Sequence, residues 1–336
     1  MNDHRAILQA SRRFTQKDDR LALANLAATL AIHLAAVVAA MTLAGQSLLA
    51  LPLAAVAGVA GIRLYVLQHD YGHYSSFSTR RANEIAGQIA SVFTLAPFRA
   101  MQYNHNLHHA GVGSLDHRET GEVYTMTRAE WDAAGPLTRL AYRVYRNPFV
   151  MLGIGAFAIF VVRYRWPKNA RRTGTAELMA HNAAVLAYMA GIVALFGWQG
   201  LAVFAGIVFL AGILGSFLVY MQHNFEDTYW EHMPEREYHE AVLQGSSALD
   251  LGQWFDIATA NINWHDLHHL NPQIPSYRLR QCHAALREEG VLEARLIGWR
   301  EALGSLRLKL WDEEAKRLVP FPPAPSRSRA RAGVAA

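Results

Sequence analysis

The chain has 336 residues, of which 52% are apolar and 18% are charged, and its formal net charge is +5. Its single cysteine, Cys282, excludes an intramolecular disulfide framework, a four-cysteine zinc site and an iron–sulfur cluster held by the protein's own thiolates. The sequence has no Walker-type phosphate loop and no GxGxxG fingerprint, so nothing in it is typical of an ATP, NAD or flavin site.

Two long uncharged blocks predict membrane-spanning helices. The blocks are residues 21–62 and 178–225, and each is about twice the roughly 20 residues that one membrane helix needs. The first block divides at residues 45–47 and the second at 197–200, where the sequences suit tight turns. We therefore expect an all-α integral membrane protein with four transmembrane helices arranged as two hairpins.

Basic residues gather at the hairpin ends opposite these turns, and they predict the orientation. Five lie before the first block and five before the second: Arg5, Arg12, Arg13, Lys17 and Arg20, then Arg163, Arg165, Lys168, Arg171 and Arg172. By the positive-inside rule, the N-terminus, the middle segment and the C-terminus are expected to be cytoplasmic. The positive charge suits anionic lipid, whereas no basic helix or aromatic-interleaved patch indicates nucleic acid as a partner.

The remaining segments complete the expected organisation. It comprises a cytosolic lead at 1–20, a transmembrane hairpin at 21–68, a cytosolic helical cap in two parts at 69–177 and 223–318, a second hairpin at 178–222 and a disordered tail at 319–336. The tail is rich in Pro, Ser, Arg and Ala, a composition typical of disorder. The apolar segment 147–162 is shorter than a usual span, so we expect it to be interfacial or buried.

Three histidine clusters are the candidate metal ligands in the sequence. The motifs are HDYGH with His69 and His73, HNLHH with His105, His108 and His109, and HDLHH with His265, His268 and His269. Spacings of i,i+4 or i,i+3,i+4 place the members of a cluster on one helix face, as a shared metal requires. The predicted topology puts all three clusters at the cytoplasmic side, where they can meet.

A ninth histidine and the number of ligands predict two metal ions. His223 ends the fourth predicted helix on the same membrane face, and nine imidazoles supply four or five ligands to each of two ions. Imidazole sites suit Zn, Cu, Fe and Ni. The sequence has neither the Glu-x-x-His of soluble di-iron carboxylate proteins nor the HExxH of zinc proteases. Asp70 and Asp266, inside the clusters, are candidates for orienting an imidazole N–H, unless they are merely ion-paired or solvated.

With these motifs the sequence resembles the membrane fatty acid desaturase family, because HDYGH, HNLHH and HDLHH match its three histidine boxes in order, type and approximate spacing. Segments 146–155, 220–231 and 268–283 are similar to the bacterial branch that includes omega-6, delta-12-type acyl desaturases. Two departures are Tyr71, where many relatives carry a small residue, and Asp266, where many carry an apolar one. Neither departure removes a ligand.

The resemblance implies a four-helix membrane stem and a cytosolic cap that holds two irons. It also implies O2-dependent insertion of a cis double bond, with the eight box histidines as catalytic metal ligands and His223 as the extra ligand. An unactivated methylene has no acidic proton, so the metal centre carries the chemistry while the protein supplies an apolar tunnel and positions one C–C bond. The substrate would be an acyl lipid, an acyl-CoA or an acyl carrier protein, and the expected location is a bacterial inner membrane.

Reduction of O2 requires two external electrons. Since the sequence has no flavin motif, no recognisable haem domain and too few cysteines for a cluster, a separate ferredoxin or b-type cytochrome is implied as the donor. The basic cytoplasmic surface, including the Arg163–Arg172 stretch, would suit an acidic redox partner.

Two other functions compete with the desaturase interpretation. A hydroxylase, ketolase or alkane monooxygenase would use the same di-iron chemistry, and the segments at 222–231 and 274–279 favour the desaturase. A non-catalytic metal transporter or haem-binding membrane protein would place ionisable residues at mid-membrane, where only His33 and His181 are candidates. His33 is more simply explained by a hydrogen bond to a neighbouring carbonyl.

Overall fold

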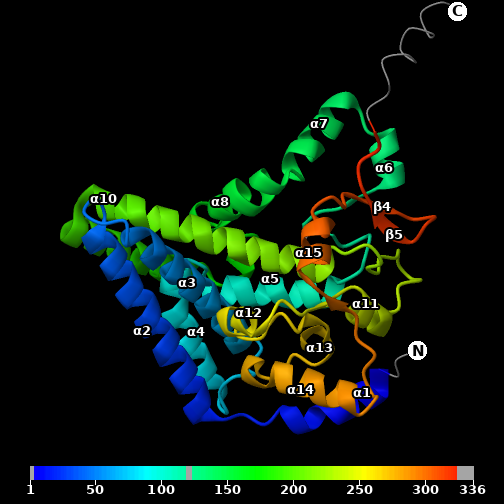
Figure 1. The fold of residues 1–336 in the computed structure, drawn as a ribbon, viewed down its shortest axis with the longest axis horizontal. Helices are drawn as coiled ribbons and strands as arrows, with labels where there is room; N and C mark the ends of the chain where they lie inside the picture. The colour runs from blue at the N-terminus through cyan, green and yellow to red at the C-terminus, as the bar shows by residue number, and fades with distance from the viewer. Residues whose placement is uncertain (1–3, 119–122, 324–336) are drawn as a thin grey trace, which may run out of the picture.

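The protein is described by a computed structural model that covers residues 4–118 and 123–323. Long helices dominate the chain, and Figure 1 shows them gathered beside a region of shorter helices. The N-terminal α1 (His4–Ser11) and η1 (Arg12–Phe14) lie against α14 (Ser276–Glu288) in that region.

The first uncharged block forms a helical hairpin. It consists of α2 (Asp19–Leu43) and α3 (Ala50–Gly72), which pack along each other. Asp18 caps α2, because its carboxylate accepts hydrogen bonds from the backbone N–H groups of Arg20 and Leu21. The reversal contains Gly45 at φ +77°, a left-handed conformation that glycine adopts without steric penalty. The turn predicted at residues 45–47 therefore separates two helices.

The second uncharged block folds back on itself within α10 (Thr175–His223), which bends at Gly197, where φ is +64° and ψ is −168°. The rings of Tyr188 and Phe204 lie 5.4 Å apart, whereas 16 residues of straight helix would separate them by about 24 Å. The two reversals are neighbours, since a Cβ placed on Gly45 would lie 2.9 Å from Nε2 of Gln199. The two halves of α10 thus fold back on each other at Gly197.

Three helices are long and apolar enough to cross a membrane in the described part of the chain: α2, α3 and α10. A bent pair, Pro136–Tyr145 and Phe149–Arg165, would add a fourth candidate if its members, which meet at 66°, formed one span. Large apolar side chains near the two reversals are exposed, with Leu48, Leu195 and Trp198 each at 75% or more. Such contiguous apolar exposure is typical of a lipid-facing surface.

The apolar segment 147–162 forms η2 (Phe149–Gly155) and α8 (Ala156–Val161) and packs on the second half of α10. η2 and α10 approach each other closely at Gly153, where an added Cβ would lie 3.0 Å from the Phe209 ring. Phe149 and Val162, at the two ends of the segment, are about two-thirds exposed, at 68% and 67%. Its place relative to a membrane stays a prediction.

Shorter elements complete the fold around the helix ends. They are α4 (Arg80–Thr94), α5 (Phe98–Gly111), α6 (Arg128–Ala133), α7 (Pro136–Tyr145), η3 (Arg163–Arg165), α9 (Ala170–Thr173), α11 (Tyr238–Gln244), α12 (Gln253–Ala258), α13 (His265–Leu270) and α15 (Trp299–Ser305). Five short strands join them: β1 (Met126–Thr127), β2 (Ala248–Leu249), β3 (Leu296–Ile297), β4 (Leu310–Asp312) and β5 (Arg317–Val319).

These strands correct the all-α expectation. One sheet has the order β1-β4-β5, with β1 parallel and β5 antiparallel to β4, and the other pairs β2 with β3 in parallel. Strands of two or three residues are too short to produce an alternating pattern, and β1 pairs with a strand far away in sequence, so the sequence carries no local signal for them. The tail predicted from residue 319 begins in β5, and residues 324–336 lie outside the described part of the chain.

A buried arginine fastens the end of α10, where His223 lies. Arg146 is fully buried, and its Nη2 donates hydrogen bonds to the Tyr220 hydroxyl at 3.0 Å, to Oδ1 of Asn224 at 2.9 Å and to the Leu308 carbonyl at 3.1 Å. Lys309 donates in turn to the Arg146 carbonyl at 2.7 Å. The network joins the end of α7, the end of α10 and the segment before β4.

Candidate metal centre

Four helices bring the nine predicted histidines together. His69 and His73 lie at the C-terminal end of α3, and His223 is the last residue of α10. The other six come from α5 and α13: His105, His108 and His109, then His265, His268 and His269. Each histidine lies at the end of one of the long apolar helices α3 and α10 or on one of the shorter helices α5 and α13, so the site forms where the long helices end.

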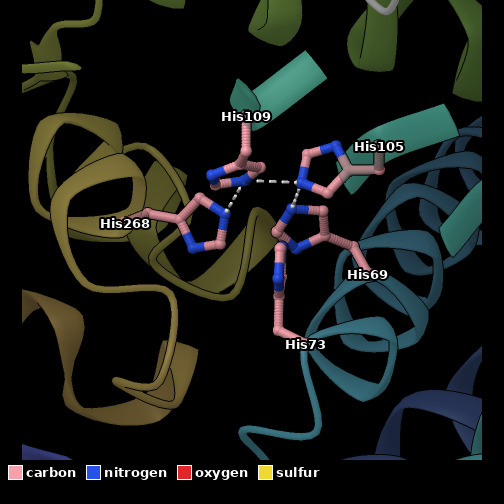
Figure 2. Close-up of side chains that lie close together, drawn as sticks. All are labelled: His69, His73, His105, His109 and His268. Carbon is pink, nitrogen blue, oxygen red and sulfur yellow. Dashed lines mark hydrogen bonds between the residues drawn. The ribbon is translucent and has the colours of Figure 1, made fainter. Parts of the chain in front are cut away.

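Five imidazoles form a first histidine group, which consists of His69, His73, His105, His109 and His268 (Figure 2). One ring nitrogen from each lies within 4.8 Å of those of the others. Nε2 of His105 is 2.7 Å from Nε2 of His69 and 2.9 Å from Nε2 of His109, and the latter is 3.2 Å from Nε2 of His268. The ring nitrogens therefore converge on one another from three helices.

The other four imidazoles form a second histidine group, which consists of His108, His223, His265 and His269, again with nitrogens within 4.8 Å. All four are buried. Nε2 of His265 lies 3.2 Å from Nε2 of His223 and 3.0 Å from Nε2 of His269. Nδ1 of His223 donates to the Gly245 carbonyl at 2.9 Å, so its Nε2 carries the lone pair and faces the group.

The spacing of the histidines divides each HxxHH motif between the two groups. On α5 the i,i+4 pair His105 and His109 joins the first group, while His108 joins the second. On α13 the i,i+4 pair His265 and His269 joins the second group, while His268 joins the first. The groups are adjacent, because the rings of His109 and His269 stack with centroids 4.2 Å apart. Two motifs thus supply six side chains to two neighbouring centres.

Burial keeps these imidazoles neutral. It lowers the pKa of six of them well below 6.5, and neighbouring imidazoles lower it further: His73, His105, His109, His265, His268 and His269. A neutral imidazole offers a lone pair, which is the form that binds a metal. Converging lone pairs at hydrogen-bond distance repel one another unless a proton or a cation lies between them. The donor set therefore fits two metal ions of the class that imidazole prefers.

The two aspartates within the histidine boxes differ in their surroundings, because Asp70 lies beside His69 and Asp266 beside His283. Oδ2 of Asp70 accepts from the backbone N–H of Ser276 at 2.8 Å, at the start of α14, and Oδ1 lies 3.6 Å from Nδ1 of His69. Asp266 accepts from the N–H of Leu267 at 2.8 Å, and its Oδ2 lies 3.3 Å from Nε2 of His283. The structure thus gives Asp266 a partner outside both histidine groups.

The remaining buried histidines have ordinary partners. Nδ1 of His33 lies 3.0 Å from the Ala57 carbonyl, and Nε2 of His181 lies 3.0 Å from the Ser91 carbonyl. Residues 4–118 and 123–323 contain two groups that could hold a metal, and neither includes these histidines. Sequence reasoning missed the Gly245 carbonyl that orients His223, because the turn after α11 carries no local sign of that contact.

Comparison with known proteins decides the family. A family model described as "Fatty acid desaturase" matches residues 46–300. A protein named "Fatty acid desaturase" from Bacillus subtilis (strain 168) is 37% identical over 276 residues, which cover 82% of this chain and 78% of that protein. The chain belongs to the fatty acid desaturase family. The family predicted from the three histidine boxes is therefore confirmed, and the protein is an oxidoreductase rather than a non-catalytic transporter.

More distant relatives carry more specific names. "Omega-6 fatty acid desaturase, chloroplastic" from Glycine max is 28% identical over 255 residues, covering 71% of this chain and 56% of that protein. "sn-1 oleoyl-lipid 12-desaturase" from Anabaena variabilis is 28% identical over 245 residues, covering 69% of this chain and 67% of that protein. The family, the apolar helices and the two histidine groups together indicate a membrane-associated desaturase with a metal centre.

Proposed function

We propose that this desaturase inserts a cis double bond into a fatty acyl chain, in an O2-dependent reaction at a di-iron centre. The observation that carries the proposal is the division of nine imidazoles into adjacent groups of five and four at the ends of apolar helices. In this proposal the first histidine group holds one iron and the second holds the other. The eight box histidines and His223 are the ligands.

The chain's own residues hold, orient and shield the centre. When bound, the irons supply the reduction of O2 and the removal of hydrogen from an unactivated methylene, which side-chain acid–base chemistry cannot achieve. Burial of eight of the nine imidazoles excludes bulk water. The Gly245 carbonyl holds one tautomer of His223, and Asp70 links the end of α3 to the start of α14 beside His69.

A small cavity of about 30 Å³, far below the volume of an acyl chain, lies beside α3. Its lining includes Tyr65, Phe93, Phe160 and Phe204, and Tyr65 precedes His69 by one helical turn. The delta-12 or omega-6 position of the double bond is proposed from the names of the relatives at 24–28% identity. The form in which the acyl chain arrives, as lipid, acyl-CoA or acyl carrier protein, is left to experiment.

The proposed membrane arrangement follows the two hairpins. α2, α3 and the two halves of α10 would be four spans, with both reversals on one side and the histidine groups in a cap on the other. The basic residues before each hairpin support a cytoplasmic cap, N-terminus and C-terminus, as the positive-inside rule predicts. We propose the bacterial cytoplasmic membrane as the location. Labelling of cysteines introduced at Leu48 and Trp198 by a membrane-impermeant reagent on intact cells would test the orientation.

Expression in a host that makes only saturated and monounsaturated acids tests the reaction. Total fatty acids are analysed by gas chromatography–mass spectrometry with derivatives that locate double bonds, beside a His268→Ala variant. We expect a new unsaturated acid that the variant does not make. A hydroxylated or keto product would reassign the protein to oxygen insertion at the same centre. Purified protein that turns over no acyl substrate with a chemical reductant while holding two irons would refute desaturation.

A further inference from the structure

The short helices α12 and α15 turn large apolar side chains outward. α12 exposes Trp254 at 61% and Ile257 at 62%, and α15 exposes Trp299 at 40% and Leu303 at 53%. The rings of Trp254 and Trp299 stack with centroids 5.7 Å apart and planes 6° apart, so the two helices share one surface. These four side chains are here named the tryptophan patch. A contiguous exposed apolar surface marks a site of interaction with protein or lipid.

α12 has the polarity of its two faces reversed. The Asp256 carboxylate is turned inward, where it accepts a hydrogen bond from Nδ2 of Asn263 at 2.7 Å and lies 3.2 Å from Nε of Arg280. Trp254 and Ile257 occupy the outward face of the same helix. A helix that faces water keeps its charged residues outside and its apolar residues inside. The arrangement of α12 therefore suits an apolar medium at its outer face.

A hydrogen-bonded arginine holds α12 at the edge of the long apolar helices. Arg63 is the first charged residue after the uncharged block 21–62. Its guanidinium donates hydrogen bonds to the Ile257 carbonyl of α12 and, at 2.7 Å, to Oδ1 of Asn25 on α2. Arginines near the end of a membrane helix extend to the membrane–water boundary. α12, which also packs against α3, is therefore held at the height of that boundary.

α15 reaches the same region through α10. The Trp299 ring stacks with the ring of Phe217 at a centroid distance of 6.1 Å. Phe217 lies six residues before the end of α10, within the uncharged block 178–225. The tryptophan patch thus continues the apolar surface of a long helix. Tryptophan is typical of this position, because its ring prefers the layer between lipid headgroups and acyl chains.

We propose that the tryptophan patch inserts into the headgroup layer of the membrane, on the side where the histidine groups lie. This inference rests on the proposed function, in particular its membrane arrangement, and adds a contact with lipid made by helices that do not span the bilayer. Lipid is favoured over a second copy of this chain or another protein, because the patch continues the apolar surface of α10 and α12 is fastened at the height of the boundary.

The depth of a nitroxide spin label tests the proposal in purified enzyme, reconstituted in nanodiscs of phosphatidylcholine and phosphatidylglycerol. Ile257→Cys places the label in the patch, Tyr238→Cys places it on α11 and Val38→Cys places it on α2. All three residues are exposed, and charged residues surround the control Tyr238 in the sequence. Collision rates are measured with O2, which concentrates in lipid, and with a water-soluble nickel chelate. Because the native Cys282 is buried, protein without an introduced cysteine should take up no label.

We expect labels at Ile257 and Val38 to collide more with O2 than with the nickel chelate, and the order to be reversed at Tyr238. Trp254→Glu should shift the Ile257 label toward water, because a charge is costly in the apolar layer. The matched change Tyr238→Glu should leave that label unchanged. An Ile257 label that Trp254→Glu does not move would overturn the proposal.

Two other results at Ile257 would also overturn it while the Val38 label stays in lipid. One is nickel accessibility equal to that at Tyr238, which would show that water covers the patch. The other is a label shielded from both reagents, which would show a contact with protein. Nickel accessibility at Val38 would instead refute the membrane arrangement, and the inference with it. Since none of these readings depends on turnover, an enzyme that desaturates nothing still tests the patch.

Discussion

The unequal size of the two histidine groups predicts unequal effects of losing one ligand. His73→Ala leaves four imidazoles in the first group, whereas His223→Ala leaves three in the second. Loss of a residue that only supports a ligand costs about 10–100-fold in metal affinity, so loss of a ligand from the smaller group should cost at least about 100-fold, or about 2.8 kcal/mol. We expect His73→Ala to keep two irons and His223→Ala to keep about one.

Iron content after a fixed exposure to a chelator measures this difference. Purified wild type, both variants and His117→Ala, an exposed histidine outside both groups, are analysed by mass spectrometry of the metal. The His117→Ala control should match the wild type. Equal iron loss in His73→Ala and His223→Ala, or two irons retained in His223→Ala, would refute the assignment of five ligands to one centre and four to the other.

Three further predictions concern stability and reactivity. Arg146→Met should lower the free energy of unfolding by about 3 kcal/mol or more, because Tyr220, Asn224 and the Leu308 carbonyl lose a donor and each buried acceptor left unpaired costs about 1–3 kcal/mol. A loss below about 1 kcal/mol in denaturant titration would contradict the role of this network. The metal-free enzyme should lose stability as the pH falls below 6.5, because burial lowers the pKa of His268 and His269 well below that value and the unfolded chain then binds more protons than the folded one. Each such histidine lowers the free energy of unfolding by about 1.4 kcal/mol per pH unit. A melting temperature that does not change between about pH 7 and pH 5 would refute this. Cys282 should resist alkylation until the protein unfolds, because burial raises its thiol pKa to about 12; rapid labelling of the native enzyme by iodoacetamide would show that this region is open.

Much of the candidate site could be predicted from the sequence because its signals are local. Residues spaced i, i+3 and i+4 share one face of a helix, so the two HxxHH motifs identified six candidate ligands. The nine predicted histidines do lie together. Their role as iron ligands stays a prediction. The two reversals could also be found, because Gly45 and Gly197 interrupt long apolar runs and both adopt positive φ.

Other features could not be predicted from the sequence, because they depend on contacts between segments that are distant along the chain. The strands of the β1-β4-β5 sheet have two or three residues each, too few for a periodic pattern, and β1 pairs with β4, which is distant in sequence. The partner of Asp266 is His283, which lies one loop and half a helix further along the chain. The buried Arg146 looks in sequence like one more basic residue before an apolar segment, and its burial depends on acceptors from three different elements.

The sequence by itself determined the family, the two long apolar blocks and the histidines available as ligands, because composition and the spacing of residues along one helix are local properties of the chain. The tertiary structure decided how those imidazoles are shared. α5 packs against α3, and its histidine rings meet those of α13, so that His105 and His109 join one group and His108 the other. The Gly245 carbonyl turns His223 toward the second group. The tertiary structure also left His105 as the one member of the nine that is not fully buried.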